Sequence, residues 1–335
     1  MPKKILFIVG SLNQTEQAHA VGQQLEHEYD CYYTHYYGDK LVRLANKVGL
    51  LNNTVLGKGS HFYKQTEAYV QAHHLPMDNR GERHHYDLIV TTSDLIIQDN
   101  IKDKPIILIQ EGMTDPEKLT YQLVRRFHLP RYIAGTAANG LSDEYDLFCV
   151  ASEGYKQDFV RKGARPEKMI VTGMPNYDHA AQFYENDFPH HNFVLAATSD
   201  ARETWKFDHR KKFIRRCVEI ANGRLLIFKL HPNEKVKRAV REIQDVAPDA
   251  LIFTDGNVDE MIANCDVLIT QYSTVVYTGI ALGKEVHSYF DVDKLKQLAP
   301  WQNGHTSAQR IAHVCRTVLE EGVSVAKEQF VHALA

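Results

Sequence analysis

Short apolar segments alternate with longer amphipathic segments along most of this chain. The apolar segments are rich in Ile, Leu and Val, and they lack the strict alternation of a strand with one wet face. Such a pattern predicts strands that are covered on both faces. The predicted strands are residues 4–10, 86–92, 105–110, 146–152, 169–174, 192–198, 224–230, 250–254, 266–270 and 285–290.

The segments between these strands repeat apolar residues at helical spacing. The clearest predicted helices are residues 17–29, 210–221, 234–247 and 258–265. Alternation of strand and helix predicts an α/β fold, and a polar segment at 178–192 separates two such series. We therefore predict two doubly wound, Rossmann-like domains facing a cleft, at 1–180 and 190–320, with a C-terminal helix at 321–335 packing back on the first. Segment 39–85 shows only helices and loops.

The composition narrows the class of protein. The chain has 335 residues, 44% apolar and 24% charged, with a formal charge of −3, so bulk nucleic-acid binding is not expected. No apolar run approaches the ~18 residues of a membrane span, and residues 1–13 fit a buried strand better than a secretory signal. Five scattered cysteines without a CxxC pair predict reduced thiols, a cytoplasmic location and no metal site.

Candidate binding residues follow the strands of the second domain, because ligands of open α/β sheets bind at the carboxyl ends of strands. His231 directly follows the strand 224–230, and Pro232 ends that strand because it has no N–H. We expect Asn233 to cap the next helix, so that the imidazole and the helix N-terminus can both bind phosphate. The alternative is a helix cap with an incidental histidine.

A second candidate site follows the strand 266–270. Ser273 and Thr274 stand at the start of an apolar helix, where hydroxyl and N–H groups can hold a diphosphate without a lysine. Plain helix capping would use the same geometry. An earlier loop of this domain contains Arg202, which can bind phosphate in a bidentate manner, and the weaker candidate Lys206; solvated surface charges are the alternative for both.

The first domain offers a glycine and two carboxylates at strand ends. Gly10 ends the first strand and would allow a ligand to approach closely. Asp94 and Glu111 each follow a strand, where a carboxylate suits a general base. Asp115 precedes a proline and is explained as a helix N-cap, which leaves Glu111 unexplained. We predict Glu111 as the base, with Asp94 as the second candidate.

Two runs of the second domain, KLHPNE (229–234) and DVLITQYSTVVYTGIALGKEV (266–286), resemble the C-terminal domain of the GT-B superfamily. The pattern is most similar to that of the CDP-glycerol glycerophosphotransferases and related capsule and wall-polymer transferases. The matching residues are Lys229, His231, Pro232, Asp266, Tyr272 and Ser273. The resemblance implies a nucleotide-binding C-terminal domain in which Tyr272 lies among the binding residues. Gln271 stands where that family tends to have an acid.

Other segments resemble the non-hydrolysing UDP-N-acetylglucosamine 2-epimerases, which are also GT-B proteins. These are IQEGMTD (109–115), TSDARETW (198–205), HPNEKV (231–236) and VTGMPNYD (171–178). This likeness places Glu111 on the family's glutamate and Arg202 on its arginine. The family's glycine-rich diserine turn, with its paired glutamates, is replaced by STVVYTG at 273–279.

Together these patterns predict a cytoplasmic, metal-independent and inverting glycosyltransferase without a cofactor, in surface polysaccharide or glycoconjugate synthesis. It would move a sugar from a nucleotide-sugar donor to a carbohydrate or glycolipid acceptor that Glu111 or Asp94 deprotonates. The residues expected on the donor are His231, Ser273, Thr274, Arg202 and Tyr272. A 2-epimerase, a polyol-phosphate transferase using a CDP-polyol and a non-enzymatic nucleotide-sugar sensor are the alternatives. Peripheral membrane contact and oligomeric state are left open.

Overall fold

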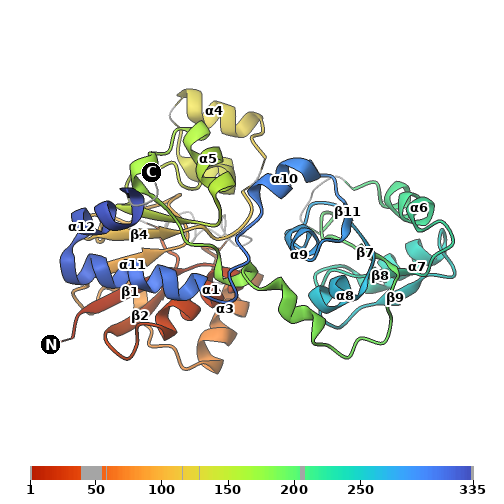
Figure 1. The fold of residues 1–335 in the computed structure, drawn as a ribbon, viewed down its shortest axis with the longest axis horizontal. Helices are drawn as coiled ribbons and strands as arrows, with labels where there is room; N and C mark the ends of the chain where they lie inside the picture. The colour runs from red at the N-terminus through yellow and green to blue at the C-terminus, as the bar shows by residue number, and fades with distance from the viewer. Residues whose placement is uncertain are drawn as a thin grey trace. The chain divides into compact units, whose positions relative to one another are not determined.

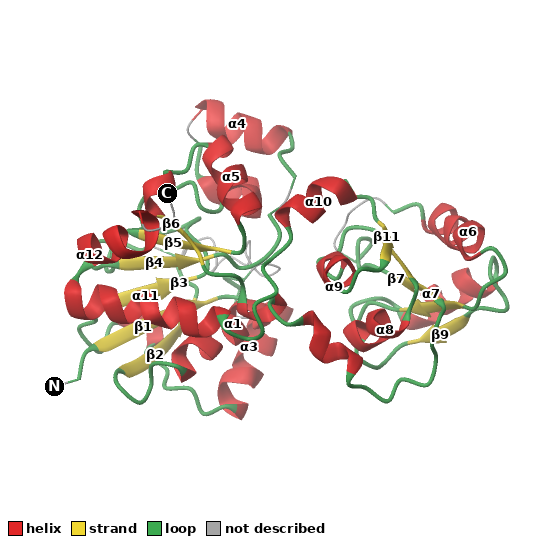
Figure 2. Cartoon of the chain, in the orientation of Figure 1, coloured by secondary structure: helices red, strands yellow, loops and turns green. Residues whose placement is uncertain are grey.

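The computed structural model describes residues 2–38, 55–57, 59–114, 116–127, 129–203 and 208–332. The chain forms two compact units, one made of Met1–Asp178 with Asn303–Ala335 and the other of His179–Gln302. Each unit contains one parallel β-sheet flanked by helices, as the labels in Figure 1 and the colours in Figure 2 show. The predicted α/β class with two doubly wound domains is confirmed.

Within the described residues, the sheet of the first unit has six parallel strands in the order β2-β1-β3-β4-β5-β6. They are β1 (Lys4–Val9), β2 (Asp30–His35), β3 (Leu88–Thr91), β4 (Ile106–Ile109), β5 (Leu147–Val150) and β6 (Met169–Val171). Alternate residues of β1, namely Ile5, Phe7 and Val9, share one core cluster with α1 and α11. This is the two-residue period of a strand with both faces covered.

The helical segments of the first unit come from residues 12–177 and from residues 307–332. They are α1 (Leu12–Gln23), α3 (His61–Ala72), η1 (Asn79–Gly81), α4 (Leu119–Phe127), η2 (Arg131–Ala138), α5 (Glu153–Lys162), η3 (Pro166–Lys168), η4 (Pro175–Tyr177), α11 (Ser307–Glu321), α12 (Val323–Lys327) and η6 (Glu328–His332). Ile311 and Cys315 of α11 are fully buried in the core of this unit. Residues 303–320, which the sequence analysis assigned to the second domain, therefore group with the first unit, because their apolar face packs there.

The second unit has a five-stranded parallel sheet in the order β11-β10-β7-β8-β9, counted over its described residues. Its elements are η5 (Ala180–Tyr184), β7 (Val194–Ala197), α6 (Arg210–Ala221), β8 (Leu226–Lys229), α7 (Val236–Gln244), β9 (Leu251–Phe253), α8 (Val258–Asn264), β10 (Val267–Thr270), α9 (Val276–Ala281), β11 (Glu285–His287) and α10 (Val292–Leu298). Val194 and Phe228 pack with α6 and α7, whereas Leu195 and Ile227 pack with α8. Both faces of the sheet are therefore covered, as predicted.

All ten predicted strands are present, each one to three residues shorter than predicted. Strand β2, whose residues DCYYTH mix polar and aromatic side chains, was not predicted from the sequence. The first helix was predicted to begin at residue 17, whereas α1 begins at Leu12 behind a capping box of Ser11 and Gln14. Residues 39–54 of the unassigned segment, as well as Asp115 and Lys206, lie outside the described residues.

Three findings concern the thiols, membrane-spanning helices and metal-binding clusters considered from the sequence. All five cysteines are buried and free. In the described part of the chain, no helix is both long enough and apolar enough to cross a membrane. Over the same residues, no three His, Cys, Asp or Glu side chains are grouped so that they could hold a metal ion.

Candidate functional site

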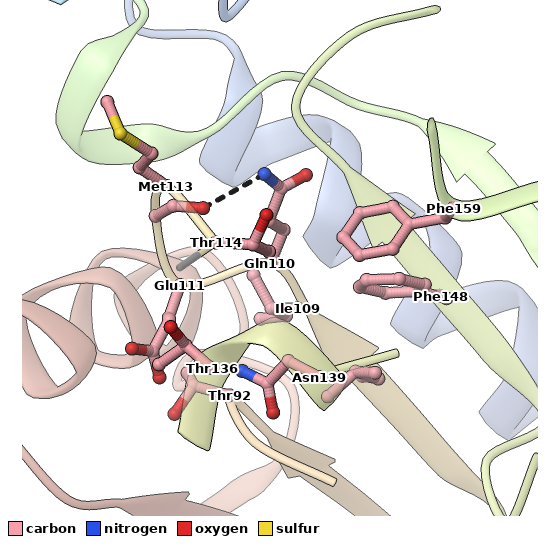
Figure 3. Close-up of a pocket in the computed structure, with 12 residues that line it drawn as sticks. Thr92, Ile109, Gln110, Glu111, Met113, Thr114, Thr136, Asn139, Phe148 and Phe159 are labelled. Atoms are coloured by element: carbon pink, nitrogen blue, oxygen red, sulfur yellow. Dashed lines mark hydrogen bonds between the residues drawn. The ribbon is translucent and has the colours of Figure 1, made fainter. Parts of the chain in front are cut away.

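A small pocket lies at the carboxyl ends of β3 and β4 in the first unit. Its described lining residues are Thr92, Leu108, Ile109, Gln110, Glu111, Gly112, Met113, Thr114, Thr136, Asn139, Phe148 and Phe159. Figure 3 shows the side chains of Glu111, Thr92 and Thr136 gathered in one part of the pocket and the rings of Phe148 and Phe159 in another. The pocket thus pairs polar groups with an aromatic wall, which is the usual composition of a small-molecule site.

Glu111 is held by the first turn of α1. Gln14 closes the capping box by accepting a hydrogen bond from Ser11 N through Oε1 (3.0 Å), so its Nε2 is left to donate to the Glu111 carboxylate. Asn13 Nδ2 and Gln17 Nε2 donate to the Glu111 carbonyl, both at 2.8 Å. A helix N-terminus favours a nearby negative charge. Glu111 is therefore fixed in position by neutral amide groups.

Asp94, the second candidate base, has a structural role. Its side chain is 0% exposed, and its two oxygens accept hydrogen bonds from Gly140 N (2.7 Å) and Ser142 N (2.8 Å). Burial raises the pKa of this carboxyl, while the two backbone N–H groups act in the opposite direction. A substrate hydroxyl has no access to a carboxylate enclosed in this way, so Asp94 is removed from the candidate bases.

Gly10 is required by packing within the unit. A Cβ at this position would lie 2.5 Å from Gln14 Oε1 and 3.5 Å from Tyr36 Cβ. The close approach that the sequence analysis assigned to a ligand is therefore made by the Gln14 side chain. Gly10 contributes to the site indirectly, because it leaves room for the amide that holds Glu111.

In the second unit, His231 follows β8 at the carboxyl edge of the sheet, as predicted. Its side chain is 35% exposed, and Nδ1 lies 3.9 Å from Asp200 Oδ2. Asn233 N donates to Nδ1 at 3.2 Å, so a neutral imidazole carries its proton on Nε2 and presents an N–H donor. The expected cap is wrong: α7 starts at Val236, and the Asn233 side chain donates instead to Asp200 (3.0 Å).

A buried network fixes the backbone next to His231. Glu234 accepts hydrogen bonds from His231 N (3.1 Å), from the Thr198 hydroxyl and from Arg210 Nη2 (2.5 Å). The Glu234 side chain is 0% exposed and that of Arg210 is 3% exposed. Arg210 also lies 3.0 Å from Asp208. The chain segments after β7 and β8 are therefore joined by buried charges.

Gln271 extends this network to the end of β10. Its Nε2 donates to Asp208 Oδ1 (2.7 Å), and its Oε1 accepts from Ser199 Oγ (2.9 Å). The side chain is 2% exposed. A glutamate here would oppose Asp208 and lose the donor, which explains physically why a neutral amide occupies this position.

Arg202 is engaged within the protein. Both of its terminal nitrogens donate to the two oxygens of Glu242 at 2.8 Å, and this pair raises the pKa of Arg202 and lowers that of Glu242. A guanidinium held in a bidentate carboxylate pair has already used the face that would bind phosphate. The structure therefore gives Arg202 an internal partner in place of the predicted ligand.

Ser273 and Thr274 lie just before α9, partly exposed. The helix begins at Val276 with Val275 as its N-cap, so neither residue is the predicted cap. Because α9 has only six residues, its macrodipole is small, and a phosphate site here would depend on the two hydroxyls.

The two candidate binding positions are separated by one strand of the sheet. β7 lies between β8 and β10, so a ligand touching both His231 and Ser273 must span roughly 10 Å, two strand spacings.

Tyr272 belongs to an exposed aromatic cluster. Its ring is 54% exposed and meets Tyr289 at 5.4 Å and Phe290 at 5.1 Å between centroids, both edge to face. The two partners follow β11 and lie near the end of β10. Such a ring can stack on a base or a sugar because its apolar face is open to solvent. Tyr272 was predicted from the family resemblance, whereas Tyr289 and Phe290 were not predicted.

Comparison with solved structures gives matches over nearly the whole chain at low identity. A protein from Listeria monocytogenes described as a UDP-N-acetylglucosamine 2-epimerase has a TM-score of 0.58 and 14% identity, covering 96% of this chain and 98% of its own. The Methanocaldococcus jannaschii UDP-GlcNAc 2-epimerase, solved with UDP-GlcNAc and UDP, has a TM-score of 0.54 and 14% identity, covering 93% and 99%. The Neisseria meningitidis UDP-GlcNAc 2-epimerase, bound to UDP-GlcNAc, has a TM-score of 0.54 and 11% identity, covering 94% and 100%.

No protein-family model matches the sequence, and no curated protein matches it significantly. At 11–14% identity the structural matches define the fold. Together with the two parallel sheets they confirm the predicted GT-B fold. The reaction has to be argued from the side chains at the two strand edges.

Proposed function

We propose that this chain is a metal-independent glycosyltransferase that uses a nucleotide-activated sugar and no cofactor. In this proposal the pocket of the first unit binds the acceptor and Glu111 is the general base. The second unit binds the donor through His231, Ser273 and Thr274, with Tyr272 against the base or sugar. The UDP-GlcNAc bound in two of the matching epimerase structures makes UDP-sugars the first donors to test.

The ionisable side chains of the pocket favour transfer over epimerisation. Among the described residues that line the pocket, Glu111 alone has an ionisable side chain. Transfer with direct displacement needs one base to deprotonate the acceptor hydroxyl. Epimerisation has to remove a proton from a carbon and return one, which calls for more than one proton-transfer group. Asp94, the other carboxylate predicted as a base, has both oxygens occupied by backbone N–H groups.

The chemical step follows from these roles. Glu111 takes the proton of the acceptor hydroxyl, whose oxygen forms a bond to the anomeric carbon as the bond to the nucleotide diphosphate breaks. The configuration at that carbon is inverted. The Nε2–H of His231 and the hydroxyls of Ser273 and Thr274 would stabilise charge on the departing phosphate. The Gln14 amide that donates to the Glu111 carboxylate is neutral, so this contact adds no positive charge.

The test is the Glu111→Gln variant. We expect it to bind nucleotide as the wild type does and to lose transfer by about 10²–10⁴-fold, the usual contribution of general base catalysis. A thermal-shift panel of UDP, CDP, CMP, GDP and ADP first identifies the nucleotide, because binding raises the melting temperature by mass action. Release of that nucleotide from its sugar donor, with a panel of carbohydrate acceptors, then measures transfer.

The control is Glu153→Gln, which removes an exposed carboxylate from the first turn of α5 and should change neither quantity. Transfer that persists in Glu111→Gln would assign the proton to another group.

The second candidate is a 2-epimerase, favoured by the described activity of the matching structures. Incubation with UDP-N-acetylglucosamine alone separates the two functions: an epimerase forms the epimer without any acceptor, whereas a transferase leaves the sugar unchanged. Nucleotide binding restricted to CDP and CMP would point instead to the polyol-phosphate transferase.

A further inference from the structure

Exposed apolar side chains are concentrated on α4 and the segment that follows it. Among the described residues, six large apolar side chains between positions 119 and 133 are at least 40% exposed: Leu119 (75%), Leu123 (40%), Phe127 (61%), Leu129 (41%), Tyr132 (52%) and Ile133 (49%). With Lys118, Arg125 and Arg126 they form what we call the α4 patch. Figure 1 shows α4 at the periphery of the first unit. A concentration of exposed apolar side chains on one segment indicates a candidate interaction site.

The patch is a second apolar face on a helix whose first apolar face is already packed. Tyr121 and Val124 are buried against Ala134 and Ala137 of η2. Leu119, Leu123 and Phe127, at spacings of four residues, form a separate stripe that is turned to solvent. The packing of the unit therefore explains the inner face of α4 and leaves the outer stripe without a structural role.

The charged side chains of α4 and of Lys118 have one sign, and Glu117, just before them, is paired with Arg161. Lys118, Arg125 and Arg126 are exposed, and none of them forms an ion pair with another described residue. The sequence contains no Asp or Glu from position 118 to position 133. Arg131 adds little, because it is paired with Glu144 at 3.2 Å. The patch is thus apolar in its centre and positive at its margin.

We propose that the α4 patch docks on the surface of an anionic lipid bilayer. A helix with Leu and Phe on one face and Lys and Arg beside them has the composition of an interfacial helix. Basic side chains near an anionic surface are attracted to it and strengthen binding. This inference does not depend on which reaction the chain catalyses.

Two other occupants fit less well. A second copy of the chain across a two-fold axis would bring two positively charged patches together, which opposes association. A stable protein partner typically covers about 20–30 residues a side, whereas the patch is one short helix and the turn after it. Membrane adsorption requires only a few apolar side chains with favourable charges.

The experiment is co-sedimentation of the full chain with vesicles of equal phosphatidylcholine and phosphatidylglycerol, compared with phosphatidylcholine alone. We expect binding to the anionic vesicles only, weakened by salt because the charges are exposed. The double variant Arg125→Glu with Arg126→Glu should weaken this binding by at least about tenfold. Leu119→Gln with Phe127→Gln should weaken it comparably, and both variants should keep the wild-type melting temperature.

The matched controls lie in the second unit. Lys211→Glu with Lys212→Glu on α6 makes the same change in net charge, and Val236→Gln removes another exposed apolar side chain. Both should bind vesicles as the wild type does. The proposal fails if the wild type ignores anionic vesicles, or if the controls lose as much binding as the patch variants. It also fails if the patch variants abolish self-association or binding to an acidic polypeptide while vesicle binding is unchanged.

Discussion

The carboxyl edges of the two sheets use charged residues in different ways. At the edge of the first sheet, the carboxylate of Glu111 accepts a hydrogen bond from the Gln14 amide and lines a pocket. At the edge of the second sheet, Arg210 and Glu234 are buried as a pair, and an imidazole and hydroxyls are left partly exposed. The first edge therefore presents a carboxylate, whereas the second buries its Arg210–Glu234 pair and presents an imidazole and hydroxyls beside the partly exposed Asp200.

This difference indicates how each edge is suited to its ligand. A nucleotide diphosphate carries its own negative charge, so its site needs donors in a rigid arrangement, which buried ion pairs can supply by fixing loops. An acceptor hydroxyl is neutral, so its site needs a base. The variants below separate the charges that maintain structure from the groups that would meet ligand.

The largest effect is expected for Glu234→Ala in the second unit. The substitution breaks a buried ion pair and leaves Arg210 with Asp208 as its charged partner; breaking such a pair typically costs about 3–5 kcal/mol. Both tryptophans of the sequence, Trp205 and Trp301, fall within residues 179–302, so urea unfolding followed by tryptophan fluorescence reports this unit. Glu219→Ala, which removes an exposed carboxylate of α6, should change the free energy of unfolding by less than about 0.5 kcal/mol. Equal losses in the two variants would show that the buried network adds no stability.

The next effect is expected for His231→Ala. A hydrogen bond to a charged group is worth about 1.5–3 kcal/mol, so the affinity for the matching nucleoside diphosphate should fall about 10–150-fold, measured by titration calorimetry. The control is His190→Ala, since His190 precedes β7 at the amino end of the same sheet and contacts Phe188 and Phe253. Unchanged affinity in His231→Ala would remove the imidazole from the donor site.

The sequence predicted the fold well because buried parallel strands have a strong local signal. Continuous apolar runs such as those of β4 and β7 are covered on both faces and so contain few polar residues. β2 was missed because its residues are half-buried and aromatic, a pattern that local composition does not distinguish from a loop. The placement of α11 in the first unit depends on packing with α1, which no local pattern encodes.

The site was predicted less completely for a physical reason. A position directly after a strand makes a residue a candidate for the site, but it does not reveal the partners of that residue. Four candidates share this position: Glu111, Asp94, His231 and Arg202. Asp94 and Arg202 are satisfied by groups more than 35 residues away in the sequence. The one local signal that was overlooked is the spacing of Ser11 and Gln14, which is that of a capping box and fixes the amide that holds Glu111.

Gln14→Glu tests that positioning role. A glutamate preserves the capping box, so α1 should be as stable as before, but its carboxylate would face that of Glu111. Like charges favour protonation, so the acidic limb of the transfer rate should move to higher pH by about one unit. Gln23→Glu makes the same chemical change at the other end of α1 and should leave the profile unchanged. A purely structural role of Gln14 would lower the rate without moving the limb.

The smallest effect on ligand binding is expected for Arg202→Ala, and here Glu242→Ala is the decisive companion. Suppose that Arg202 only forms the ion pair with Glu242. Both variants should then lose about 1 kcal/mol or less of stability, because partly exposed ion pairs contribute little. Both should also bind nucleotide within about twofold of the wild type. If Arg202 instead turns to phosphate when the donor binds, the two variants should diverge. Arg202→Ala would then weaken binding, and Glu242→Ala would strengthen it, because the guanidinium would no longer have to leave a carboxylate. A divergence of tenfold or more, measured by titration calorimetry, would return Arg202 to the donor site.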